Sequence, residues 1–196
     1  MKYTERYLNK LWDVINQVEI KNKKKKNIVF DDAINIVIDK LKKVKKTDKK
    51  VIFIGNGGSA GIASHQSIDY LKNGGIPAIC FNDPSLLTCL SNDYGYEYVF
   101  EKPIDMFGKK GDVLIAISSS GKSKNIINAV RAAKKKGLFV VTLSGFLKTN
   151  PLFKLGDLNF YVPSKSYGHV EISHAIISHT ILDTYMKSNI WGIKNV

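Results

Sequence analysis

The chain has little of what membrane-spanning and secreted proteins need. No apolar run approaches the roughly 18 residues of a membrane span, and the start, residues 1–6, lacks the apolar core of a signal peptide. Only two of the 196 residues are cysteines, Cys80 and Cys89, and they lack C-x-x-C spacing. A disulfide framework and a paired-cysteine metal site are therefore disfavoured. We expect a cytoplasmic protein with two packed thiols and no membrane partner.

Arginine is also scarce. The net charge is +13, yet only Arg6 and Arg131 among the 30 basic residues are arginines. Specific base readout relies on the bidentate arginine fork, whereas the lysine-rich segments 23–26, 42–50 and 134–136 fall in linkers and on solvated helix faces. We interpret them as solvated lysines, which disfavours a nucleic-acid partner and leaves other anionic partners open. The positive field would also steer an anionic sugar toward the protein.

No linker rich in proline, glycine or serine divides the chain, which predicts a single domain over residues 1–196. Segments 4–20 and 31–45 carry apolar residues at helical spacing, so N-terminal helices (1–47) precede an α/β core (48–196). Their apolar faces could pack on the sheet or on another subunit. Apolar runs that alternate with helical segments predict a five-stranded parallel α/β sheet flanked by helices, with strands near 51–54, 77–81, 113–117, 138–143 and 158–162.

A serine-rich turn follows the third of these runs and precedes a helical segment. It contains Ser118, Ser119, Ser120, Gly121 and Ser123. The N-terminus of a helix attracts anions through its free N–H groups and its dipole. Helix capping by serine is the simpler alternative, but four hydroxyls in six positions favour a phosphate site. The spacing of a P-loop is missing, which disfavours a nucleoside triphosphate here.

A glycine-rich turn of similar design follows the first of these runs and contains Asn56, Gly57, Gly58 and Ser59. Its glycines would let a ligand approach the main chain, and its serine can cap the next helix. Ligands of open parallel sheets bind beyond the carboxyl ends of the strands, so the two turns could hold one sugar phosphate between them. Tight packing of strand and helix also selects glycine, and a G-x-G-x-x-G fingerprint is absent.

Histidine and carboxylate side chains recur at helical spacing. His65 and Asp69 are four residues apart and share a helix face, which is a metal-ligand spacing. Glu171 and His179 are eight residues apart, about 80° around the helix axis, so both could lean toward one point. Two imidazoles and two carboxylates would suit Zn²⁺. Ordinary hydrogen-bonded histidines are the alternative interpretation.

Five motifs together resemble the sugar isomerase (SIS) domain, and most closely the bacterial phosphoheptose isomerases. In order along the chain they are residues 55–59, His65, residues 91–95, residues 117–123 and residues 171–179. The resemblance implies an aldose–ketose isomerase that converts sedoheptulose 7-phosphate to D-glycero-D-manno-heptose 7-phosphate for lipopolysaccharide or capsule biosynthesis. It also implies a homotetramer with one Zn²⁺ per subunit.

The resemblance further implies the roles of single residues. Asp69 takes the proton and His179 is the partner acid and base. The implied zinc ligands are His65, Asp69, Glu171 and His179, and the implied substrate-binding residues are Asn56, Gly57, Gly58, Ser59, Asp93, Ser118, Ser119, Ser120, Ser123 and Glu171. Asp69 and Glu171 stand where the family has Glu and Gln.

Two other functions remain open at this stage. One is a non-catalytic SIS protein that binds a phosphosugar or a partner protein, and the other is an isomerase of another phosphosugar. An acidic residue at position 69 together with His179 favours an enzyme. For Asp93, a turn or helix cap is as good an interpretation as a sugar contact.

Overall fold

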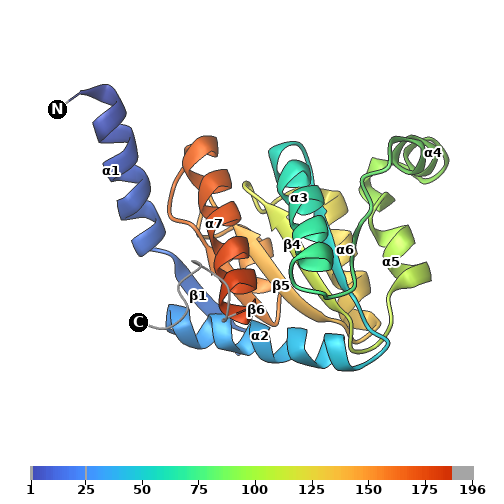
Figure 1. The fold of residues 1–196 in the computed structure, drawn as a ribbon. Coiled ribbons are helices and arrows are strands. Elements are labelled where there is room, and N and C mark those ends of the chain that lie inside the picture. The colour runs from blue at the N-terminus through green and yellow to red at the C-terminus, as the bar shows by residue number, and fades with distance from the viewer. Residues whose placement is uncertain (1, 25, 187–196) are drawn as a thin grey trace.

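The computed structural model describes residues 2–24 and 26–186 (Figure 1). Its centre is one six-stranded sheet with the strand order β1-β6-β5-β4-β2-β3. Neighbours from β6 through to β3 are parallel, and β1 is antiparallel to β6. The strands are β1 (Glu19–Asn22), β2 (Val51–Gly55), β3 (Ala78–Cys80), β4 (Val113–Ser118), β5 (Phe139–Ser144) and β6 (Leu158–Tyr161).

Helices cover both faces of the sheet, which gives three layers. One core cluster joins the sheet to α2, α3 and α7, and a second joins its other face to α5 and α6. The helix α1 extends away from the sheet, and α4 lies at the opposite end of the molecule (Figure 1). The helices are α1 (Tyr3–Asn16), α2 (Phe30–Lys46), α3 (Gly58–Lys72), α4 (Pro84–Tyr94), α5 (Glu101–Phe107), α6 (Lys124–Lys135) and α7 (Tyr167–Met186).

The unbroken apolar runs of the central strands are explained by these two helix layers. In β4, Val113, Ile115 and Ile117 belong to the first core cluster, whereas Leu114 and Ala116 belong to the second. Successive side chains of a strand point to opposite faces, so a strand covered on both sides is apolar at every position. The five predicted parallel strands and the N-terminal helices are confirmed.

A sixth strand, β1, was not predicted. The helical pattern over residues 4–20 ends early, because α1 stops at Asn16 and the chain then pairs with β6. Only Ile20 of the four β1 residues is buried, and it lies opposite Phe160. The strand is held at the edge of the sheet by its pairing with β6, and Ile20 adds one side chain to the first core cluster.

Both cysteines are free, and only Cys80 packs against the core. Cys89 is exposed on α4, a helix that buries none of its residues, so the prediction of a second packed thiol is wrong. Nowhere in residues 2–24 and 26–186 does a helix combine the length and the apolarity needed to cross a bilayer.

Candidate functional site

The glycine-rich and serine-rich turns meet at one cavity. Strands β2 and β4 are parallel neighbours, so the turns that follow them lie at the same edge of the sheet. A cavity of about 220 Å³ between them is lined by Asn56, Gly57, Gly58, Ser59, Ser118, Ser119, Ser120, Ser123, Tyr167 and Glu171. Every residue predicted to bind the substrate is in this lining, with the single exception of Asp93.

The serine-rich turn is curved by Gly121 and held by its own hydroxyls. Gly121 has φ +62°, and a Cβ there would collide with the buried Asn150 side chain. The Gly121 N–H donates to Ser118 Oγ (3.2 Å), and the Lys122 N–H donates to Ser120 Oγ (3.2 Å). Glycine is therefore required at this bend.

The remaining hydroxyls of the turn are left for a ligand. Ser123 precedes α6, yet its side chain makes no capping hydrogen bond, and its Oγ lies 3.4 Å from Ser118 Oγ. Ser119 Oγ is buried and has no hydrogen-bond partner in the part of the chain that the structure describes. A buried hydroxyl without a partner is costly. The arrangement therefore favours an anion in the cavity, which would accept hydrogen bonds from these hydroxyls, over simple helix capping.

Asn56 connects the glycine-rich turn to the start of α6. Its amide donates to Asn125 Oδ1 (3.0 Å), and the Asn125 amide donates back to Asn56 Oδ1 (2.9 Å). The Tyr96 hydroxyl also donates to Asn56 Oδ1 (3.0 Å), and the Ile126 N–H donates to Asn125 Oδ1 (3.0 Å). Most of the hydrogen-bonding capacity of Asn56 is therefore used to hold the two turns together.

A second group of polar side chains lies where α3 packs against α7. His65 Nε2 is 3.1 Å from Asp69 Oδ2, and His179 Nδ1 is 4.0 Å from the same oxygen. One potential ligand atom from each residue lies within 4.8 Å of the other two. The Asp69 side chain is only 19% exposed, between the two imidazoles. Two imidazole nitrogens and one carboxylate oxygen are donor types that Zn²⁺ takes, so these three side chains could hold it.

Glu171 does not join this group. Its carboxylate lies so close to Gly58 that a Cβ there would collide with it. Glu171 and His179 are eight residues apart, which is a rise of about 12 Å along α7. Their similar direction around the helix does not bring the two side chains to one point, and Glu171 lines the serine cavity instead.

The structure also leaves Asp93 outside the cavity. It is exposed near the end of α4, where its carboxylate accepts from the Asn92 amide (2.9 Å) and lies 3.7 Å from Cys89 Sγ. Tyr167, which does line the cavity, was missed by the sequence analysis. It stands four residues before Glu171, so the shared helix face was the available signal.

A buried, uncharged histidine lies on the same helix as His179. His174 on α7 is fully buried, and this burial lowers its pKa to about 4 against the opposing effect of the Ser144 carbonyl. Gln66 on α3 is also fully buried, and its amide has no hydrogen-bond partner among the described residues. These two buried polar side chains therefore carry no charge near neutral pH.

Residues 6–145 match the family model of the SIS domain. A phosphoheptose isomerase of Cytophaga hutchinsonii is 40% identical over 169 residues, which cover 83% of this chain and 85% of that protein. The solved phosphoheptose isomerase of Neisseria gonorrhoeae is 30% identical with a TM-score of 0.73, over 80% of this chain and 87% of that one. The one from Francisella tularensis shares the fold, with 24% identity and a TM-score of 0.80 over 96% and 100% of the two chains.

Proposed function

This chain belongs to the SIS domain family and to its phosphoheptose isomerases, and we propose that it converts sedoheptulose 7-phosphate to D-glycero-D-manno-heptose 7-phosphate. The observation that carries the proposal is the cavity shared by the two turns, with the His65, Asp69 and His179 group farther along the two helices that border it. The product would supply heptose for lipopolysaccharide or capsule biosynthesis.

The phosphate group of the substrate binds in the serine cavity. The hydroxyls of Ser119, Ser120 and Ser123 face it, and the N-terminus of α6 adds N–H donors and its positive dipole end. Hydrogen bonds to a charged phosphate are stronger than those to neutral groups. Binding at this end of the sugar positions the reacting carbons at the other end.

The spacing along α3 suits a seven-carbon sugar. Ser59 and His65 are six residues apart, a rise of about 9 Å. An extended heptose 7-phosphate measures about 10 Å from phosphorus to C1, at about 1.2 Å for each bond along the chain. A phosphate held by the serine-rich turn therefore brings C1 and C2 near the carboxylate and imidazoles of the second group.

Proton transfer between C1 and C2 needs a base near carbon and an acid near oxygen. Asp69 takes a proton from C1 of the ketose, which gives the enediol, and returns it to C2. His179 moves the other proton between the oxygens O1 and O2. Asp69 is well placed as the base because it lies between the imidazoles of His65 and His179.

Zn²⁺ is part of the proposal, with His65, Asp69 and His179 as its protein ligands. When bound, zinc polarises the sugar carbonyl and stabilises negative charge on the adjacent oxygens. The two imidazoles and the carboxylate supply the donor types that zinc prefers. Loss of one ligand in His65→Gln should lower the zinc content of purified protein, measured by mass spectrometry of the metal.

We also propose a cytoplasmic homotetramer. Leu8 and Trp12 of α1 are 63% and 68% exposed, and Ile176 of α7 is 38% exposed. They line a groove of about 480 Å³ between the two helices. Exposed apolar surface of this kind marks a site of association, and a second copy of the chain is the partner that the family resemblance implies.

The test of the function is to incubate zinc-loaded protein with sedoheptulose 7-phosphate and follow the aldose signals by NMR. We expect the aldose to accumulate to an equilibrium with the ketose. Fructose 6-phosphate, one carbon shorter, should turn over more slowly. Folded, zinc-loaded protein that binds the heptose phosphate without turnover would instead support the non-catalytic alternative.

A further inference from the structure

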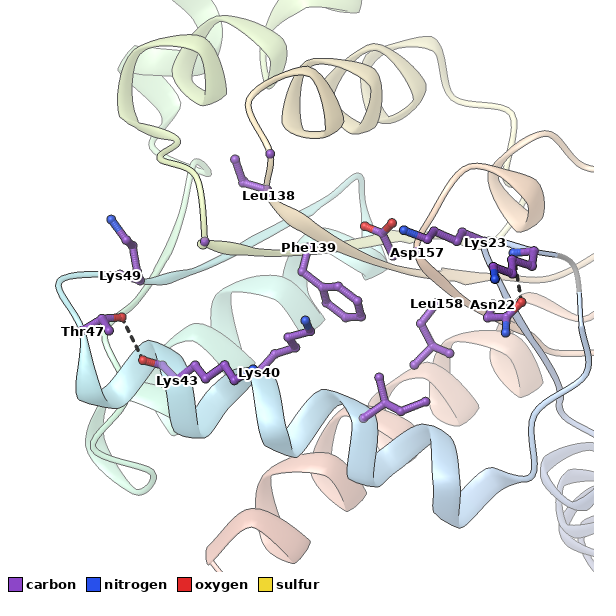
Figure 2. Close-up of a pocket in the computed structure, with 14 residues that line it drawn as sticks. Asn22, Lys23, Lys40, Lys43, Thr47, Lys49, Leu138, Phe139, Asp157 and Leu158 are labelled. Carbon is purple, nitrogen blue, oxygen red and sulfur yellow. Dashed lines mark hydrogen bonds between the residues drawn. The ribbon is translucent and has the colours of Figure 1, made fainter.

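A second cavity lies at the opposite end of the parallel strands from the serine-rich turn. It has a volume of about 580 Å³ and lies where β5 and β6 begin, above the helix α2 (Figure 2). It shares no residue with the serine cavity.

One part of this cavity is apolar. Ile36 of α2 and Leu158 of β6 contribute aliphatic side chains, and the half-buried Phe139 points its ring into the space between β5 and α2 (Figure 2). Sites for small molecules are concave and mostly apolar, with volumes of roughly 300–1,000 Å³. The volume of this cavity lies in that range, and one part of its lining is apolar.

The rest of the lining is strongly basic. Five lysines contribute to it, namely Lys23, Lys24, Lys40, Lys43 and Lys49, and no ion pair engages any of them among the residues described. The Lys40 ammonium lies 4.7 Å from the centre of the Phe139 ring, a cation–π contact that holds it beside the apolar part. Five unpaired cations around one cavity repel one another unless an anion joins them.

The single carboxylate of the lining, that of Asp157, offsets only part of the charge of the five lysines. Asp157 Oδ2 accepts from the Val140 N–H (3.0 Å), so the side chain is held to the start of β5. The Asp157 carbonyl accepts from the Lys23 N–H (2.9 Å), which holds the backbone of Lys23 beside the start of β6. Asn22 Oδ1 accepts from the Lys24 N–H (2.9 Å).

We propose that this cavity binds a nucleoside diphosphate, with the base against Phe139 and its aliphatic neighbours and the diphosphate beside Lys40 and Lys43 of α2. A small inorganic anion would use the lysines and leave the apolar part in contact with water. An uncharged apolar molecule would leave the lysines unneutralised. A nucleoside diphosphate combines a flat aromatic base, whose faces can pack on Phe139, with several negative charges, so it matches both parts of the lining.

The experiment is calorimetric titration of the full chain with ADP and with UDP at low salt. We expect saturable binding of one nucleotide per chain, with adenosine and pyrophosphate alone each at least about tenfold weaker. Lys40→Gln combined with Lys43→Gln should weaken nucleotide binding by about tenfold or more, because each removes a charged donor. The matched control is Lys42→Gln, on the same helix but outside the lining, and should change affinity less than about twofold.

Two further variants keep the result interpretable. Phe139→Leu should weaken ADP more than pyrophosphate, since only the nucleotide has a base to pack on the ring. Ser123→Ala, in the serine cavity, should leave ADP affinity unchanged. The proposal is overturned if neither nucleotide binds, if pyrophosphate binds as tightly as ADP, if the double lysine variant binds normally, or if Ser123→Ala abolishes binding.

Discussion

Asp69 is the side chain on which the proposed chemistry depends, because it lies between the imidazoles of His65 and His179. Replacement by asparagine keeps the size and removes the base, so we predict that Asp69→Asn lowers kcat by about 10²–10⁴-fold. Asp69→Glu should retain activity, because it keeps the carboxylate that the family has at this position. Steady-state kinetics by NMR and thermal melts of both variants measure this.

The control for this prediction is Asp39→Asn, which removes an exposed carboxylate on α2 far from the site. It should leave both kcat and the melting temperature near the parent values. Parent-like turnover by Asp69→Asn would show that Asp69 is not the base and would direct attention to His179.

Buried His174 makes the fold sensitive to acid. Its pKa is lowered to about 4 by burial, whereas an unfolded chain gives histidine a pKa of about 6.5. Between these values the unfolded state binds more protons, so stability falls as the pH falls. We predict a loss of about 2 kcal/mol from this residue between about pH 7 and pH 5, measured by urea unfolding of metal-free protein.

A variant without the titrating ring separates this effect from other groups. His174→Leu should show a shallower decline of stability over the same pH range. An equally steep decline in that variant would assign the acid sensitivity to other side chains.

For single residues, the sequence predicted contacts between near neighbours in the chain better than contacts between distant segments. The serines of the phosphate turn are neighbours in the chain, so their convergence needed only the strand and the helix on either side. The pairing of His65 with Asp69 needed only one helical turn. The motifs predicted that Glu171 binds the metal and that Asp93 contacts the sugar. The rise along α7 instead keeps Glu171 beside Gly58, and the position of α4 leaves Asp93 outside the cavity.

At the scale of secondary-structure elements, the serine-rich turn before α6 binds the phosphate in our proposal. Ser123→Ala should weaken substrate binding by about 1–3 kcal/mol, because a hydrogen bond to a charged group is lost. The melting temperature should change little, since the Ser123 hydroxyl does not cap α6. The measurement is KM for the sugar phosphate beside a thermal melt.

Ser120→Ala should also raise KM, with a small fall in melting temperature because Ser120 Oγ accepts from the Lys122 N–H. Ser85→Ala on α4 is the matched control outside the cavity. An unchanged KM in both variants of the turn would place the phosphate elsewhere.

The strands divide into those that a sequence reveals and one that it does not. Strands β2, β4 and β5 are apolar at nearly every position because helices cover both faces of the sheet. The strand β1 has one buried residue, Ile20, and its partner Phe160 lies far away in the chain. Only the tertiary pairing makes it a strand.

At the scale of the whole molecule, the groove between α1 and α7 carries the proposed assembly. Trp12→Glu places a charge in this apolar groove, so we predict dissociation of the homotetramer into smaller species. Sedimentation velocity at micromolar concentration measures it. Met106→Glu is the control, since Met106 is 80% exposed on α5, away from the groove.

A parent protein that sediments as a monomer would contradict the assembly itself. A Trp12→Glu variant that remains tetrameric would move the contact to another face of the molecule.

The edge strand β1 also has a consequence for solubility. It covers the outer edge of β6, whose four residues are all buried. A shortened chain that begins after β1 would expose the unpaired N–H and C=O groups of β6 beside an apolar surface. Open edges of this kind pair with other chains, so such a fragment would aggregate even though every residue proposed for catalysis is still present.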